Sequence, residues 1–346
     1  MPADKLLHPM PEGLYCPVGD FYVDPVRPVD RAVITHGHAD HARAGHGAVL
    51  ATPETLAIMD VRYGVDFTGT RQPVAYGEST TINGVEVKLV PAGHVLGSAQ
   101  AVIEHQGTRI VVSGDYKRRR DPTCARFEPV PCDVFVTEAT FALPVFRHPP
   151  TEDETAKLIA SLERFPERTH LVGAYALGKA QRVIMHLREQ GYDRPVYLHG
   201  AMEKLCSLYK EFGVDLGNLL PVAGHSKEDL AGQIVVAPPS ATRDRWSRRF
   251  ADPVTAFASG WMRVRARARQ AAVELPLIIS DHADWDELLS TIEELSPQKL
   301  WVTHGREDAL VHAAIQMGIS AKPLSLVGYD DEDGESVEIE ATDTAS

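Results

Sequence analysis

Residues 33–45, VITHGHADHARAG, decide how this sequence is interpreted. They place His36, His38, Asp40 and His41 within six positions, directly after the apolar run AVIT. Polar side chains this close together are costly to bury without partners, and imidazole and carboxylate groups are both ligands of divalent metal ions. A tight loop after a strand can make them converge, whereas a regular strand or helix cannot. We therefore expect a metal site at the end of this strand.

Three further ligand candidates each follow an apolar run later in the chain. They are His94 in PAGHVLGSAQ, Asp115 in VVSGDYK and His304 in WVTHGRE. With the first four residues they make five histidines and two aspartates. Two metal ions about 3.5–4 Å apart need such a set when one carboxylate bridges them. We predict two divalent ions, with Zn²⁺ favoured and Mn²⁺ as the alternative.

The composition indicates an ordinary globular protein. The chain has 346 residues, of which 44% are hydrophobic and 24% charged, enough for a large core. The four cysteines form no CxxC pair and are typical of reduced thiols. There is no apolar run of about 18 residues and no apolar stretch near the start that would suit a signal peptide. We expect a cytoplasmic protein that binds no membrane.

The net charge of −13 taken alone argues against a nucleic-acid partner. The charge is uneven, however, because residues 330–346 carry eight acidic and no basic side chains, and the rest of the chain has a net charge of −5. Basic clusters occur at residues 116–120, 243–249 and 263–269. Such clusters can bind phosphate groups on an acidic protein, or they can be solvated surfaces.

The order of predicted elements indicates a discontinuous domain with an insertion. Up to about residue 140, and again after residue 277, short apolar strands end in polar residues. Between these parts, amphipathic helices such as residues 178–191 alternate with short strands. We predict one domain formed by residues 1–148 and 277–330, an inserted α/β cap of residues 149–276, and a flexible acidic tail of residues 331–346.

The ligand pattern HxHxDH, followed by a histidine, an aspartate and a late histidine, resembles the metallo-β-lactamase superfamily. This resemblance implies a four-layer αββα sandwich with the metal ions at one edge. It also implies two ligand triads and a bridge: His36, His38 and His94; Asp40, His41 and His304; and Asp115 between them. Asp24, at the end of FYVD, would orient the ligands, although Asp20 is a rival by spacing.

The inserted lobe resembles the β-CASP cap of nucleic-acid nucleases. Glu138 in VTEATF and His282 in SDHADWDEL occupy that family's first and second additional motifs, and the cap segments GAYALGKAQRVI and FASGWM also match. The chain is most similar to the bacterial ligase-associated DNA exonucleases, through GLYCPVGDFYVDP, HADHAR and ISDHADWDEL. The resemblance implies DNA hydrolysis during repair, beside an ATP-dependent DNA ligase.

Two positions favour RNA as the substrate. RNA-processing members carry histidine at the third additional motif, as His304 does here, whereas eukaryotic DNA-processing members usually carry an apolar residue. Glu138 in place of aspartate points the same way. A β-CASP ribonuclease is therefore the alternative to a DNA exonuclease. A small-molecule metallo-hydrolase does not need the cap, and a non-catalytic scaffold does not need the complete ligand set.

The predicted reaction is attack on phosphorus by a water molecule activated between two metal ions. We assign catalytic roles to Asp40, Glu138 and His282. His282 would stand on the leaving-group side, and Glu138 would orient it or a water molecule. Alternatively, His282 belongs only to the cap of a helix in which Asp281 or Asp284 has the structural role.

Substrate would bind in the cleft between sandwich and cap. Arginines alternate at positions 263, 265, 267 and 269, so on a strand all four would lie on one face, as a phosphate-binding stripe or a charged edge. The predicted substrate-binding residues are Ser98, Lys117, Arg118, Lys179, Ser259, Arg263 and Arg265.

Overall fold

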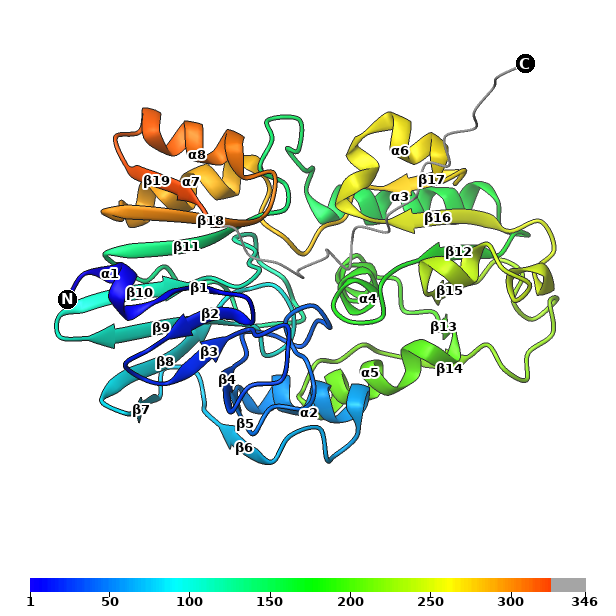
Figure 1. The fold of residues 1–346 in the computed structure, drawn as a ribbon. Coiled ribbons are helices and arrows are strands. Elements are labelled where there is room, and N and C mark those ends of the chain that lie inside the picture. Colours follow the sequence, from blue (N-terminus) through cyan, green and yellow to red (C-terminus); the bar gives the residue numbers. More distant parts are fainter. Residues whose placement is uncertain (325–346) are drawn as a thin grey trace, which may run out of the picture.

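The computed structural model describes residues 1–324 (Figure 1). The first sheet lies at the left of Figure 1 and has the order β1-β2-β3-β4-β5-β6. Strands β1 to β3 pair antiparallel, and β3 to β6 pair parallel. Its strands are β1 (His8–Met10), β2 (Gly13–Cys16), β3 (Phe21–Val23), β4 (Arg31–Val33), β5 (Ala48–Ala51) and β6 (Thr70–Pro73).

The second sheet joins two distant parts of the sequence. Its order is β19-β18-β11-β10-β9-β8-β7, and β11 pairs parallel with both β10 and β18. Residues from either side of the insertion therefore share one sheet. Its strands are β7 (Ser79–Ile82), β8 (Val85–Pro91), β9 (Ala99–His105), β10 (Thr108–Val112), β11 (Val134–Ala139), β18 (Lys299–Gly305) and β19 (Ser320–Pro323).

These two sheets pack face to face and are covered by helices. Apolar side chains of both, including Phe21, Val33, Val87 and Ile103, form one buried cluster between them. Helix α2 (Pro53–Tyr63) packs on the outer face of the first sheet, while α7 (Trp285–Leu295) and α8 (Glu307–Gln316) pack on that of the second. A short helix, α1 (Ala3–Leu6), precedes β1. The predicted four-layer αββα fold is confirmed.

A third sheet lies beside the sandwich, with all its strands parallel in the order β14-β13-β15-β12-β16-β17. Its strands are β12 (His170–Gly173), β13 (Val196–Leu198), β14 (Leu219–Pro221), β15 (Ile234–Ala237), β16 (Val254–Ala258) and β17 (Leu275–Leu277). The accompanying helices are α3 (Thr151–Arg164), α4 (Lys179–Glu189), α5 (Gly200–Glu211), α6 (Arg265–Gln270) and the 3₁₀ turns η1 (Pro239–Thr242), η2 (Ser247–Arg249) and η3 (Gly260–Arg263).

Helix α4 lies between the third sheet and the sandwich (Figure 1). Its apolar side chains share a buried cluster with Ile58 of α2 and with Leu96 of the loop after β8. This α/β lobe is the inserted cap that the sequence predicts. The exact domain boundaries remain predictions, and the predicted tail of residues 331–346 lies outside the described residues.

The expectation of a strand over residues 263–269 is wrong. This segment forms the end of η3 followed by helix α6, and the arginines at positions 263, 265, 267 and 269 are exposed on it. Arginine and alanine both favour helix, and no strand within residues 1–324 pairs with the segment to enforce an extended backbone.

All four cysteines are free thiols. Within residues 1–324, no helix is both long and apolar enough to span a bilayer.

Candidate metal centre

The loop after β4 turns sharply and brings the first ligand candidates together. The backbone N–H groups of His41 and Ala42 both donate to the carbonyl oxygen of His38, at 3.2 and 2.7 Å. The ring centroid of His36 then lies 5.0 Å from that of His38 and 4.2 Å from that of His41. The turn thus brings His41 next to His36, whereas a regular strand would point these two side chains to opposite faces.

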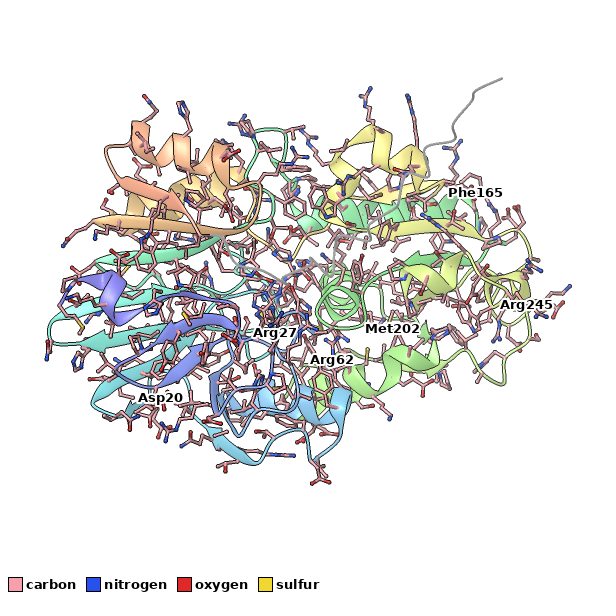
Figure 2. The ribbon with its side chains drawn as sticks, viewed as in Figure 1. Asp20, Arg27, Arg62, Phe165, Met202 and Arg245 are labelled. Atoms are coloured by element: carbon pink, nitrogen blue, oxygen red, sulfur yellow. The ribbon has the colours of Figure 1, made fainter. Side chains whose placement is uncertain are left out.

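Asp24 holds this loop from the end of β3. Its Oδ1 accepts the Thr35 N–H at 2.8 Å, and its Oδ2 accepts the Thr35 hydroxyl at 2.6 Å. Oδ2 also lies 2.8 Å from Nδ1 of His41, so the Nε2 atom of that ring is the one on the side of Asp115. Asp20 is exposed instead, at the surface of the sandwich, where its carboxylate accepts the Tyr15 hydroxyl (Figure 2).

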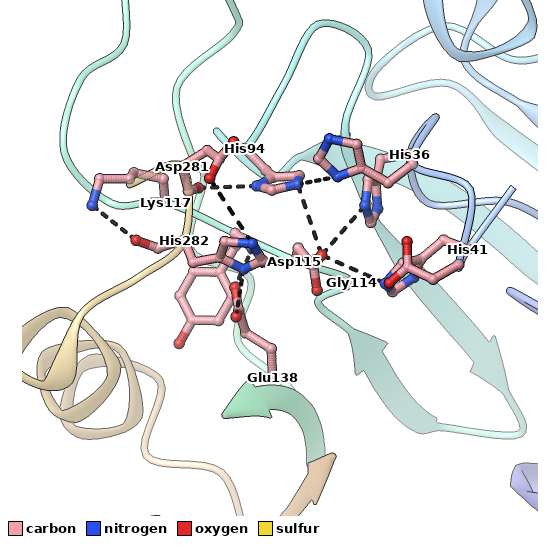
Figure 3. A network of polar contacts seen from close by, with 12 residues as sticks. His36, His41, His94, Gly114, Asp115, Lys117, Glu138, Asp281 and His282 are labelled. Atoms are coloured by element: carbon pink, nitrogen blue, oxygen red, sulfur yellow. Dashed lines mark hydrogen bonds and ion pairs between the residues drawn. The ribbon is translucent and has the colours of Figure 1, made fainter. Parts of the chain in front are cut away.

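Asp115 lies at the middle of the cluster (Figure 3). Its Oδ2 is 3.4 Å from Nε2 of His36, 3.5 Å from Nε2 of His41 and 3.7 Å from Nε2 of His94. Gly114 makes this approach possible because a Cβ there would lie 2.7 Å from the Thr35 hydroxyl, and its φ of +56° also favours glycine.

His38 and His94 complete the nearest group. Nδ1 of His38 is 2.9 Å from Nε2 of His94, whose Nδ1 lies 3.0 Å from the carbonyl oxygen of Asp281. One ligand atom from each of His36, His38, His94 and Asp115 lies within 4.8 Å of every other. Three imidazoles and a carboxylate at this spacing suit a divalent cation.

The remaining two predicted ligands lie on the other side of His41. Oδ2 of Asp40 is 3.5 Å from Nε2 of His41, and the ring of His304 lies 5.0 Å from that of His41. His304 comes from the end of β18 and has a φ of +57°, a left-handed backbone conformation that is uncommon outside glycine. The structure therefore brings all seven predicted ligands to one edge of the sandwich.

Glu138 and His282 form a pair next to this cluster. Oε2 of Glu138 lies 2.8 Å from Nδ1 of His282, and Oε1 accepts the backbone N–H of Tyr116 at 2.8 Å. The same His282 Nδ1 is 4.0 Å from Oδ2 of Asp115. Glu138 stands at the end of β11 and His282 just before α7, so the pair joins the edges of distant elements (Figure 3).

Burial keeps most imidazoles of the cluster neutral, while its carboxylates favour a positive charge next to them. Burial, and then the neighbouring imidazoles, hold the pKa values of His36 and His94 well below the ordinary range. Burial raises the pKa of Asp115 well above its usual value. Burial also opposes protonation of His41, but the carboxylates of Asp115 and Asp40 outweigh it and raise its pKa to about 10. A divalent ion bound here would supply positive charge next to these carboxylates.

Two buried polar atoms support this fit. Nε2 of His36 and Oδ1 of Asp40 have no hydrogen-bond partner within residues 1–324. Buried atoms of this kind usually have one, and both types are metal ligands. The donor set therefore fits a divalent metal ion.

The predicted substrate-binding residues divide into two groups. Arg263 and Arg265 are exposed, and Arg118 is half-buried beside Glu294. The other four side chains are buried in contacts within the chain: Ser98, Lys117, Lys179 and Ser259.

Sequence reasoning missed two residues that contact the cluster from outside. The carbonyl oxygen of Asp281 meets the His94 ring, and Arg182 of α4 donates to the carbonyl oxygen of His94. Asp281 precedes His282, and its sequence context indicates only a helix cap. Nothing in the local sequence around Arg182 indicates that it reaches a strand-end loop 88 positions away.

Two family models match the chain. One, described as a beta-lactamase superfamily domain, covers residues 14–172. The other, described as a Zn-dependent metallo-hydrolase RNA specificity domain, covers residues 268–320. The first holds six of the seven predicted ligands, and the second holds His282 and His304.

Several curated proteins are similar to this chain. A probable DNA ligase of Opitutus terrae is 28% identical over 89% of this chain and 30% of its own length. Cleavage and polyadenylation specificity factor subunit 3 of Dictyostelium discoideum is 29% identical over 58% of this chain and 31% of its own. Endoribonuclease YSH1 of Gibberella zeae is 30% identical over 58% of this chain and 29% of its own. The chain thus spans less than a third of each of these relatives.

A solved structure has the same fold. It is a protein of unknown function from Enterococcus faecalis, with a TM-score of 0.57 and 15% sequence identity, and the match covers 86% of this chain and 80% of that one. The sandwich with its strand-edge histidine and aspartate cluster is the arrangement of the metallo-β-lactamase superfamily. The two family models and the curated relatives support the chain's membership of that superfamily and of its β-CASP branch.

Proposed function

We propose that this protein is a two-metal phosphodiesterase that degrades DNA from an end. The observation that carries the proposal is the Glu138–His282 pair, whose imidazole Nδ1 lies 2.8 Å from the carboxylate and 4.0 Å from Asp115 at the metal cluster. A buried imidazole held by a carboxylate, next to a metal site, suits proton transfer to a leaving oxygen.

Divalent cations, with Zn²⁺ favoured, would polarise the scissile phosphate and lower the pKa of water. Asp115 would bridge the two ions, while His36, His38 and His94 would hold one and Asp40, His41 and His304 the other. Glu138 fixes the orientation of the His282 ring because it accepts from Nδ1. We assign the Nε2 atom of His282 to the leaving oxygen, where it protonates that oxygen or neutralises developing charge.

The preference for DNA rests on similarity over nearly the whole chain. The relative named as a probable DNA ligase matches 89% of this chain. The resemblance to ligase-associated exonucleases rests on GLYCPVGDFYVDP, HADHAR and ISDHADWDEL. A role in DNA repair beside an ATP-dependent ligase follows from that resemblance, and the cysteine pattern favours the cytoplasm. Basic residues near the metal edge would attract such a polyanionic substrate.

The exposed arginines of η3 and α6 are the best candidates for that contact. Arg267 lies over the ring of Trp261, with 4.0 Å between its guanidinium carbon and the ring centroid. The Trp261 ring is 4.8 Å from that of Phe141, which is 6.0 Å from that of His282. Two ring contacts, Trp261 to Phe141 and Phe141 to His282, therefore connect the segment that carries Arg263 and Arg265 to the proposed leaving-group site.

A β-CASP ribonuclease is the second candidate. His304 and Glu138 favour it, as do the relatives named as endoribonuclease and polyadenylation factor and the family model described by RNA specificity. These relatives match 58% of this chain each, a smaller share than the ligase relative matches.

The test is a time course on matched single-stranded DNA and RNA of one sequence, labelled at the 5′ end, with Zn²⁺ or Mn²⁺. We expect DNA to be degraded while RNA persists. Early release of labelled mononucleotide would indicate 5′ to 3′ degradation, and a shortening ladder the reverse. His38→Ala is the inactive control. Consumption of RNA with persistence of DNA would reverse the assignment, and no cleavage of either would contradict nuclease activity.

A further inference from the structure

The start of helix α4 reaches from the third sheet's lobe into the metal centre. Gly178, just before it, has a φ of +82°, and a Cβ there would lie 2.4 Å from a methyl carbon of Val95. The carbonyl oxygen of Leu177 is 3.4 Å from Nε2 of His38. The backbone of this segment therefore packs directly on the loops that carry two predicted ligands.

Arg182, one turn into α4, contacts a predicted ligand residue itself. Its Nη2 donates to the carbonyl oxygen of His94 at 2.9 Å, and its Nε pairs with the carboxylate of Asp121. The side chains of Arg182 and Asp121 are both 2% exposed. One guanidinium thus joins the helix, the segment after β10 and the loop of His94.

Lys179 anchors the first turn of the same helix. Its buried Nζ donates to Oδ1 of Asp281 at 2.5 Å. The backbone carbonyl of Asp281 in turn meets Nδ1 of His94 at 3.0 Å. His94 is therefore held at two points, its backbone by Arg182 and its ring by the residue to which Lys179 is paired.

Packing alone does not account for these charges. Removing two cations and two carboxylates from water is costly, and apolar side chains of similar volume would fill the space at lower cost. The planar fork of arginine, however, can bind a carboxylate and a carbonyl in fixed directions at once, which no apolar side chain does. The arrangement is that of an outer contact that orients a metal ligand.

We propose that Arg182 is a positioning residue for His94, carried by a helix start that Lys179 anchors. Through it, the lobe that would contact nucleic acid and the metal centre are held as one unit. The inference rests on the metal-binding part of the proposed function and is independent of the nucleic acid cleaved. It gives Lys179 an internal role in place of the predicted contact with substrate.

The test variant is Arg182→Lys in the full chain. Lysine keeps the positive charge beside Asp121, but a single ammonium lacks the fork that also reaches the His94 carbonyl. The metal-free protein is titrated with Zn²⁺ against a chromophoric chelator, and the visible spectrum of the Co²⁺-loaded protein is recorded. We expect binding at the His94 site to weaken by about 10–100-fold and the Co²⁺ spectrum to change.

Arg188→Lys is the matched control. Arg188 lies on the same helix and donates to backbone carbonyls of Leu216 and Tyr192, away from the metal cluster. The Arg188→Lys variant should lower the unfolding midpoint without changing Zn²⁺ affinity. A loss of affinity in Arg182→Lys alone would therefore reflect the position of His94 and not a general loss of stability.

If Arg182→Lys does not fold, the double variant Asp121→Asn with Arg182→Gln removes both charges together and tests the same contact. Unchanged Zn²⁺ affinity and Co²⁺ spectrum in the folded variant would overturn the inference while leaving the proposed function intact. Failure of the unaltered chain to bind any divalent ion would instead overturn the metal-binding part of the proposed function.

Discussion

The imidazole Nδ1 of His282 lies 2.8 Å from Oε2 of Glu138, although 144 positions separate the two residues in sequence. The other oxygen of this carboxylate accepts the N–H of Tyr116, the residue directly after Asp115. Glu138 therefore fixes the ring of His282 relative to the proposed bridging ligand. Because Glu138 and not a metal ion holds this ring, the effect of His282 on the rate of hydrolysis can be measured separately from metal binding.

Replacing His282 with alanine should leave metal binding intact and abolish most turnover. The expected loss of rate is about 10²–10⁴-fold, the usual contribution of a positioned general acid. Glu138→Gln should cause a smaller loss of rate than His282→Ala, because the amide oxygen can still accept one of the two hydrogen bonds. The amide NH2 group cannot accept the other. Hydrolysis rate and metal content are measured on the same samples. A near-normal rate in His282→Ala would contradict the assigned role.

Replacing Asp115 with alanine should remove both metal and activity. The carboxylate oxygen of Asp115 lies within 4 Å of imidazole nitrogens of His36, His41 and His94, so this one group contacts three of the predicted ligands. Metal content by elemental analysis is the measurement. Asp60→Asn is the control, because Asp60 pairs with Arg71 away from the cluster. Full metal occupancy in Asp115→Ala would rule out a bridging carboxylate.

Asp24→Asn and Asp20→Asn form a matched pair that tests which aspartate supports the ligands. Asp24 accepts two bonds from Thr35 and one from the His41 ring, whereas Asp20 is exposed beside Tyr15. We expect about 10–100-fold weaker metal binding for Asp24→Asn and no change for Asp20→Asn. Equal Zn²⁺ affinities of the two variants would show that the Asp24 contacts do not tune the site.

The convergence of the candidate ligands could be predicted because it follows from local pattern. Each ligand follows an apolar strand, and the ends of strands in the two sheets meet at one edge, so sequence order alone brings His94 and Asp115 to the loop of His36. The HxHxDH spacing fixes the loop itself. The fold class follows from the same alternation of strands and polar ends.

The contacts around the ligands could not be predicted in the same way. Whether Lys117 faces substrate or pairs with Glu287 depends on how the loop after β10 packs on α7, which no local period encodes. Residues 263–269 show the other difficulty. Alternating charges suit a strand face, but the helix propensity of arginine and alanine prevails where no sheet edge is available.

His148 should make the protein less stable in acid. Both its ring nitrogens are buried without a hydrogen-bond partner within residues 1–324, and burial followed by nearby Lys117 lowers its pKa to about 2. The unfolded chain binds a proton below about pH 6.5 that the folded chain does not. The contribution of the neutral, buried His148 to the free energy of unfolding is thus complete above about pH 6.5. It falls by about 1.4 kcal/mol per pH unit as the pH drops toward 2.

The measurement is the free energy of unfolding in denaturant between pH 6 and pH 4, with a chelator present throughout. His148→Leu should flatten the dependence on pH by about that slope. His312→Leu, at an exposed position, is the control. Identical slopes in the original protein and His148→Leu would show that the buried ring takes up its proton without unfolding.

Neutralising the arginines of the η3–α6 segment should weaken binding of single-stranded nucleic acid and reduce its dependence on salt. Arg263 and Arg265 are exposed, and each phosphate contact contributes about 0.7 to the slope of log affinity against log salt for a single strand. The double variant Arg263→Ala with Arg265→Ala should therefore lower that slope by about 1.4 if both bind phosphate. Binding is measured over a range of salt concentrations in the inactive His38→Ala background, so that substrate is not consumed.

The control, Arg245→Ala with Arg248→Ala, removes the same charge from exposed positions on and beside η2. Equal slopes for the two double variants would mean that net charge alone attracts the strand, and that the path from His282 through Phe141 and Trp261 does not lead to the substrate.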